Sequence, residues 1–293
     1  MTTHTEAEIA SQPDCWRRAI ELASEAGTAL PREGERVAVV GCGTSWFVAQ
    51  AYAVLRERAG HGETDAFAAS EMPTGRGYDR ILALTRSGTT TEVLDLLRDT
   101  TTATSAITAD PATPVMSLAD EVVVLDFADE RSVVQTRFAT TQLALLRAHL
   151  GEDLTRAVAD AEEAVVEPVA AELVGAEQFT FLGRGWTCGL ATEAALKMRE
   201  AARSWTESYP AMEYRHGPIS IAGPGRITWM LGQDVPQGLA DQVAATGGVF
   251  LSTHRDAMAE LVKIQRVAVE RARARGLDPD EPLHLTRSVI LDS

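Results

Sequence analysis

The sequence has few cysteines, few aromatic residues and no long apolar run, and each shortage excludes a class of protein. Cys15, Cys42 and Cys188 are an odd number without CxxC spacing, which argues against a disulfide framework and a zinc site. Aromatic residues make up 5% of the chain, whereas alanine, valine and leucine are abundant. This balance favours helices packed on parallel strands over a sandwich of short strands.

Basic residues are outnumbered, and the formal net charge is −15 over 293 residues. Phosphate backbones demand clustered lysine and arginine, so we expect no nucleic-acid partner. The acidity favours solubility and still permits a small anion held by backbone N–H groups at one helix end. No apolar run approaches a membrane span and the polar N-terminus lacks a signal-peptide profile, so we expect no membrane partner and a cytoplasmic location.

Apolar, β-rich runs alternate with helical patterns, which predicts a parallel, doubly wound α/β sheet. In the first half we expect strands at residues 36–40, 81–85, 105–108 and 121–127, and helices at 45–58, 91–97 and 132–150. A charged helix at 153–173 follows, with Pro168 as a kink or break. In the second half we expect strands at 179–182, 227–231 and 249–252, and helices at 187–203 and 256–275.

The recurrence of strand, glycine turn and helix suggests an internal duplication. The predicted organisation is a helical lead-in at 1–33, a first domain at 34–152, a connecting helix at 153–174, and a second domain with a C-terminal tail at 175–293.

Two turns rich in glycine and hydroxyl groups follow predicted strands. They are Gly41-Cys42-Gly43-Thr44-Ser45 and Thr85-Arg86-Ser87-Gly88-Thr89-Thr90. Because the carboxyl ends of parallel strands share one edge of a sheet, both turns could hold one phosphate. The alternative is a pair of tight turns with hydroxyl caps. Neither turn has the glycine spacing of dinucleotide sites or the Gly-Lys-Ser/Thr of nucleotide loops, and we expect no cofactor.

Two further motifs carry ionisable groups. Glu193, Lys197 and Glu200 fall on one helix face at i, i+4 and i+7, a pattern that also fits a solvated ladder of ion pairs. His216 precedes Gly217-Pro218 in a turn where it could exchange protons, although a lone histidine is more often structural. The six histidines lack HxxxH or HExxH spacing, so we expect no metal.

Taken in order, these motifs resemble the SIS (sugar isomerase) domain family, including the isomerase half of glucosamine-6-phosphate synthase and related double-domain sugar-phosphate isomerases and deaminases. The resemblance runs from about Arg36 to the end of the chain, and residues 130–136 look like the family's loop that closes over the sugar. It implies two tandem flavodoxin-like domains, a phosphorylated amino sugar as ligand and a homodimer.

The resemblance also implies roles for individual residues. Glu200 would move a proton between C1 and C2, His216 would assist ring opening from the partner subunit, and Lys197 would orient the base. The phosphate and sugar would be held by Gly43, Thr44, Ser45, Thr85, Arg86, Ser87, Thr90, Val133, Gln135 and Glu193.

Two departures from the family pattern limit the expected activity. The chain begins Met1-Thr2-Thr3 without an N-terminal cysteine nucleophile, so we expect no glutamine amidotransferase activity. Arg287 replaces the tail lysine that forms an imine, and it can clamp an oxyanion but forms no Schiff base under ordinary conditions.

The leading hypothesis is therefore an aldose–ketose isomerase or deaminase acting on a hexosamine 6-phosphate. Two alternatives stay open: a dehydrating lyase on an N-acylated aminosugar 6-phosphate, because the same C2 proton abstraction can expel the C3 hydroxyl, and a non-catalytic sugar-phosphate sensor.

Overall fold

The structure is a computed structural model that describes residues 2–73 and 75–291. Its contacts divide the chain into two compact units, each built around one parallel sheet. The sheet A unit comprises Asp14–Arg131, Arg137–Leu154 and Leu285–Ser293, and the sheet B unit comprises Met1–Pro13, Ser132–Thr136 and Thr155–His284. The C-terminal residues therefore group with the first sheet, although the segment before them belongs to the second.

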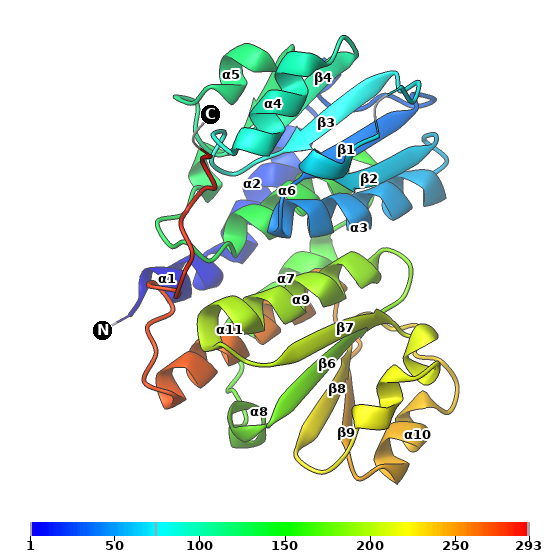
Figure 1. Ribbon diagram of the computed structural model, residues 1–293, viewed down its shortest axis with the longest axis vertical. Helices are drawn as coiled ribbons and strands as arrows, with labels where there is room; N and C mark the ends of the chain where they lie inside the picture. The colour runs from blue at the N-terminus through cyan, green and yellow to red at the C-terminus, as the bar shows by residue number, and fades with distance from the viewer. Residues whose placement is uncertain (1, 74, 292–293) are drawn as a thin grey trace. The chain divides into compact units, whose positions relative to one another are not determined.

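Sheet A has five parallel strands in the order β2-β1-β3-β4-β5. The strands are β1 (Val37–Gly41), β2 (Thr64–Ala68), β3 (Arg80–Leu84), β4 (Ala103–Thr108) and β5 (Glu121–Val124). One face packs against α4 (Thr91–Asp99) and α5 (Val115–Leu118), and the other against α3 (Thr44–Arg58) and α6 (Arg137–His149), as Figure 1 shows. Because helices cover both faces, β1 and β3 are buried throughout and read as continuous apolar runs.

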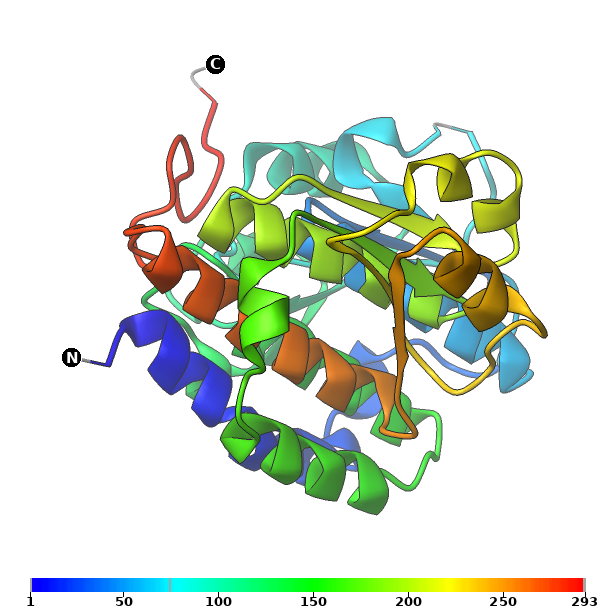
Figure 2. The same cartoon turned by 90° about the horizontal axis from the view of Figure 1, so that it is seen from below.

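Sheet B repeats the same plan with four parallel strands in the order β7-β6-β8-β9. They are β6 (Gln178–Gly183), β7 (Thr206–Pro210), β8 (Arg226–Met230) and β9 (Val249–Ser252). Helices α9 (Thr187–Ala202) and α11 (Ala257–Ala274) cover one face, and α10 (Leu239–Ala245) lies on the other (Figure 1). Within this unit α1 (His4–Ala10) and α7 (Thr155–Val166) pack along α11 (Figure 2).

The predicted parallel α/β architecture is confirmed, but strands β2 and β7 and the short helices α5 and α10 were missed. Strands β2 and β7 are edge strands whose residues after the first are at most half-buried, so their sequences lack the apolar run that marks a central strand. Helix α10 has only seven residues and buries two of them, which leaves too short a pattern to recognise.

Several predicted boundaries were wrong. The helix expected at 132–150 begins at Arg137, because residues 132–136 form no helix and group with the sheet B unit. The strand expected to reach 127 ends at Val124 and is followed by a 3₁₀ turn, Asp126–Ala128. The lead-in holds α1 and α2 (Gln12–Ala23) rather than one helix.

The break expected at Pro168 is confirmed. Helix α7 ends at Val166, and α8 (Ala171–Gly175) begins beyond the proline. Proline has no N–H for the helical ladder and its ring clashes with the preceding turn, so the connecting segment divides there.

A buried carboxyl group ties α11 to sheet B. Glu260 accepts a hydrogen bond from Trp229 Nε1 at 2.7 Å and another from Thr253 Oγ1 at 2.8 Å. Its side chain is 1% exposed, and burial raises the pKa of Glu260 above 4.5 despite these donors and Arg255.

This raised pKa predicts a pH-dependent stability. The folded state holds the Glu260 proton more tightly than the unfolded chain, so its contribution to the free energy of unfolding falls as pH rises from about 4.5 through the folded pKa. We expect wild type to lose stability relative to Glu260→Gln across that window, measured by urea unfolding at several pH values. Glu172→Gln, at an exposed position, is the control. If the free energy of unfolding depended on pH equally in wild type and Glu260→Gln, the raised pKa of Glu260 would be contradicted.

Candidate functional site

The first hydroxyl turn joins β1 to α3 and requires glycine at two of its positions. A Cβ on Gly41 would lie 2.7 Å from Ser45 Cβ, and Gly43 adopts a φ of +52°. Helix α3 starts at Thr44, and Gly43 as its N-cap residue gives no side-chain cap. The Thr44 and Ser45 side chains are buried beside the first backbone N–H groups of the helix, which is the arrangement that suits an anion.

The second hydroxyl turn joins β3 to α4 and is held by its own side chains. Thr85 Oγ1 accepts a hydrogen bond from the Gly88 N–H at 3.2 Å, and Ser87 Oγ accepts one from the Thr89 N–H at 3.3 Å. Ser87 Oγ and Thr90 Oγ1 lie 3.4 Å apart. Thr85 and Ser87 are buried, so their hydroxyl groups are fixed within the loop.

Sheet A brings the two turns to one edge. Strands β1 and β3 are parallel neighbours in register, with Val40 opposite Ala83, so both turns leave the sheet at its carboxyl end. The chain proceeds in opposite directions from these strands, toward β2 on one side and β4 on the other. Ligands of open α/β sheets bind at such a switch point.

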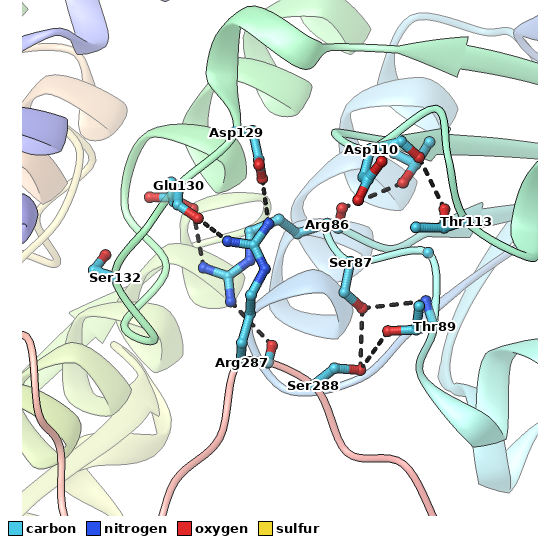
Figure 3. A network of polar contacts seen from close by, with 12 residues as sticks. Arg86, Ser87, Thr89, Asp110, Thr113, Asp129, Glu130, Ser132, Arg287 and Ser288 are labelled. Carbon is cyan, nitrogen blue, oxygen red and sulfur yellow. Dashed lines mark hydrogen bonds and ion pairs between the residues drawn. The ribbon is translucent and has the colours of Figure 1, made fainter.

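Arg86 of the second turn and Arg287 of the C-terminal tail each form an ion pair with an acidic residue (Figure 3). The guanidinium of Arg86 contacts Glu130 Oε2 at 3.3 Å, with side-chain exposures of 1% and 0%, and donates to the Arg287 carbonyl oxygen at 3.0 Å. Arg287 in turn pairs with Asp129 and donates to the Glu130 carbonyl oxygen. Both cations expected to meet the substrate therefore have protein partners within the sheet A unit.

Cys42 adds no negative charge to the first turn. Burial raises the pKa of its thiol to about 11, with Glu92 adding to the effect. The thiol is consequently neutral at pH 7 and does not oppose an anion there.

A buried ionic cluster occupies α9 of the sheet B unit. Lys197 Nζ lies 2.5 Å from Glu200 Oε2 and 3.3 Å from Glu193 Oε1. The side chains of Glu193 and Lys197 are 0% and 1% exposed, whereas that of Glu200 is 17% exposed. A solvated ladder is therefore the wrong interpretation of this motif. Two carboxylates share one ammonium, and Glu200 is the member that solvent reaches.

The remaining predicted residues lie elsewhere in the sheet B unit. His216 is exposed and follows the 3₁₀ turn η4 (Glu213–Arg215), with its backbone N–H donating to Glu213 O at 2.9 Å. Val133 and Gln135 are half-buried in the irregular segment 132–136.

Sequence reasoning assigned no individual role to four residues at or beside the second turn: Thr89, Asp129, Glu130 and Ser288. Ser288 lies about 200 positions beyond the turn it contacts, and no pattern within the sequence relates the two. The acids were overlooked because a buried partner for Arg86 cannot be read from local spacing.

Across residues 2–73 and 75–291, no group of three or more histidine, cysteine, aspartate or glutamate side chains could hold a metal ion. In the same part of the chain, no helix combines the length and apolarity needed to cross a membrane.

The fold defines a class: an α/β protein whose parallel sheet places two hydroxyl-bearing turns at its topological switch point. Solved structures share this fold. Glucosamine-6-phosphate deaminase from Thermotoga maritima superposes with a TM-score of 0.83 and 26% identity, covering 99% of this chain and 100% of that one. Tagatose-6-phosphate ketose/aldose isomerase from Escherichia coli gives a TM-score of 0.76 at 19% identity, covering 97% of each chain.

The relatives found by sequence are also named as enzymes of sugar phosphates. The chain is 29% identical over 296 residues to the isomerizing glutamine–fructose-6-phosphate aminotransferase of Sulfolobus acidocaldarius, a match that covers 88% of this chain and 50% of the relative. The chain thus spans about half the length of the curated relatives it matches. No protein-family model matches the chain. The proteins it resembles are sugar-phosphate isomerases and enzymes that act on related amino sugars.

The conformation of the second turn depends on Gly88. Its φ is +61°, and a Cβ there would lie 2.1 Å from Thr113 Oγ1 and 2.9 Å from Val115 Cγ1. We expect Gly88→Ala to lower the free energy of unfolding by about 2–4 kcal/mol, from left-handed backbone strain and overpacking.

Denaturant unfolding measures this effect. Gly77→Ala is the matched control in the same unit, because its added Cβ would meet nothing within 4 Å. Equal stabilities for the two variants would refute the steric argument.

Proposed function

We propose that this protein is a sugar-phosphate isomerase or deaminase that acts on a hexosamine 6-phosphate by moving the C2 proton. The observation that carries the proposal is the α9 cluster, in which a buried lysine fixes a carboxylate that solvent can reach. A structural ion pair would gain nothing from a second buried acid, because each buried charge adds a desolvation cost.

The hydroxyl turns of the sheet A unit supply the proposed phosphate site. Neutral hydroxyls and helix N-termini bind a phosphate dianion without a dedicated cation. The residues proposed for this role are Gly43, Thr44, Ser45, Thr85, Ser87 and Thr90. Arg86 takes part through its position in the turn, since its guanidinium is held by Glu130.

Glu200 is the proposed base in the sheet B unit. It would take the proton from C2 of the opened sugar and return it to C1, while Lys197 orients the carboxylate and stabilises charge on the enediol oxygen. We propose that Glu193 holds Lys197 in place, and that Val133 and Gln135 contact the sugar. When the C2 substituent is a free amine, the proton transfer leaves an imine at C2, and its hydrolysis by water would release ammonia.

We also propose that the chain contains two tandem domains of one kind, whose parallel sheets lie within residues 34–152 and 175–293. Their shared strand order supports a duplication. Similar proteins support the substrate class: by name, one is a glucosamine-6-phosphate deaminase, another an isomerizing glutamine–fructose-6-phosphate aminotransferase, and a third a tagatose-6-phosphate isomerase. Glutamine-dependent amination is not part of the proposal.

A dehydrating lyase is the second candidate, and Arg287 favours it. The guanidinium is paired with Asp129 and has no neutral amine to form an imine with a ketose. Proton abstraction at C2 without such an imine can end in expulsion of the C3 hydroxyl. The same base and phosphate site serve both reactions.

A panel of sugar 6-phosphates incubated with the purified protein separates these functions. Proton NMR would detect ketose, ammonia or unsaturated sugar, which correspond to isomerase, deaminase and lyase. Binding of a sugar phosphate without any of these products would contradict an enzyme and identify a sensor.

Glu200→Gln tests the base directly. We expect turnover to fall by about 10²- to 10⁴-fold, because the amide cannot accept the proton, while the Kd for the sugar phosphate stays within about threefold. Steady-state kinetics and calorimetric titration measure the two quantities. Glu172→Gln, an exposed acid of the same unit, is the control, and retained turnover in Glu200→Gln would remove Glu200 from the mechanism.

We propose further that the protein is a homodimer in which His216 completes the partner's site, as its exposed position permits. Glu200→Gln and His216→Ala should each be strongly impaired alone. A mixture that exchanges subunits should recover about a quarter of wild-type activity, because half of the dimers are hybrids and each hybrid has one intact site. No recovery on mixing, with exchange verified by mass spectrometry, would place His216 in its own subunit's site.

A further inference from the structure

The C-terminal tail brings a hydroxyl group into the second turn of sheet A (Figure 3). Ser288 Oγ accepts hydrogen bonds from Thr89 Oγ1 at 2.9 Å and Ser87 Oγ at 3.1 Å, and lies 3.4 Å from Thr90 Oγ1. Two of these partners, Ser87 and Thr90, belong to the proposed phosphate site. Ser288 therefore sits among the phosphate-binding hydroxyls without being part of their loop.

The tail is fixed on both sides of Ser288. On one side, Arg287 pairs with Asp129 and its carbonyl oxygen accepts from the Arg86 guanidinium at 3.0 Å. On the other, the Val289 carbonyl oxygen accepts from the Thr91 N–H at 3.2 Å. Beyond it, the Leu291 N–H donates to Thr91 Oγ1 at 2.9 Å. The tail thus also satisfies the first turn of α4, where backbone N–H groups otherwise lack partners.

These contacts determine what the Ser288 hydroxyl can do. A hydroxyl group has one proton to donate and two lone pairs to accept with. The oxygen of Ser288 accepts from both Thr89 and Ser87, which occupies its two lone pairs, so its own proton is what remains for a further acceptor. A donor that is itself accepting a hydrogen bond is polarised and donates more strongly.

We propose that Ser288 is a further phosphate-binding residue, which donates its proton to a phosphate oxygen beside Ser87 and Thr90, and that Thr89 positions it. When phosphate binds, the single proton of Ser87 turns from Ser288 to the phosphate. The inference rests on the proposed function, because it concerns the same phosphate site. Thr89 is the one hydroxyl of the second turn to which that function assigns no role. Arg287 accordingly serves to anchor the tail.

Calorimetric titration of the full chain with inorganic phosphate and with glucosamine 6-phosphate tests this inference. Ser288→Ala should raise the Kd for both by about tenfold or more, since it removes a hydrogen bond to a charged group. Ser288→Thr keeps the hydroxyl and should stay within about threefold of wild type. The control is Ser117→Ala, which removes an exposed hydroxyl of the same unit that bonds only locally, to Pro114 O.

Thr89→Val tests the positioning role. It should weaken phosphate binding less than Ser288→Ala does. In the double variant the two effects should not add, because Thr89 acts through Ser288. Additive losses would overturn the assignment of Thr89 as the positioning residue.

Hydrogen exchange at the Thr91 amide distinguishes phosphate binding from mere docking of the tail. This amide donates to Val289, so it remains protected while the tail is attached. Weaker phosphate binding in Ser288→Ala with Thr91 still protected supports the proposal, whereas weaker binding with Thr91 exposed overturns it. An unchanged Kd overturns it too, and a lower Kd would mean that the hydroxyl competes with phosphate.

Binding of the two probes, inorganic phosphate and glucosamine 6-phosphate, by the wild-type protein distinguishes a failure of this inference from a failure of the proposed function. If wild type binds neither probe, the proposed function fails. If wild type binds and Ser288→Ala binds equally well, only the role of Ser288 is lost.

Discussion

The parallel pairing of β1 with β3 is the constraint on which the rest of the sheet A site depends. These neighbours bury their apolar side chains under helices on both faces, so their carboxyl ends are fixed relative to each other. The chain leaves them in opposite directions, which opens the edge between two turns. The turns contain glycine for steric reasons: a Cβ at Gly41 would overlap Ser45, and a Cβ at Gly88 would overlap the Thr113 side chain.

Electrostatic neutrality distinguishes this edge from a simple basic pocket. Arg86 and Glu130 form a buried pair, and Arg287 is paired with Asp129, so neither guanidinium stands as an isolated charge. An anion at this edge would contact hydroxyl and N–H dipoles whose orientations are fixed by the fold. Such an anion would be compatible with a chain of net charge −15, since the field of local dipoles dominates at contact distance.

The sheet B unit shares the strand order of sheet A but has different residues in the corresponding turns. Its turns after β6 and β8 are joined by Arg184 and Asp234, whose charged atoms lie 2.9 Å apart, and by Thr187 Oγ1 donating to Leu231 O at 3.0 Å. An exposed ion pair occupies the position that the hydroxyl cluster has in sheet A. The ionisable groups of interest lie instead within α9, where burial and a shared lysine hold two carboxylates together.

The sequence by itself determined the alternation of buried strands and helices, the two hydroxyl turns and the i, i+4, i+7 spacing of Glu193, Lys197 and Glu200, because each depends on residues close together in the chain. Edge strands β2 and β7 escaped prediction because half-buried strands lack a continuous apolar run. Only the tertiary structure decided that Glu130 neutralises Arg86, that the α9 cluster is buried, and that Ser288 reaches Ser87 and Thr89. Contacts between residues far apart in sequence follow from how packed elements meet, and local spacing carries no record of them.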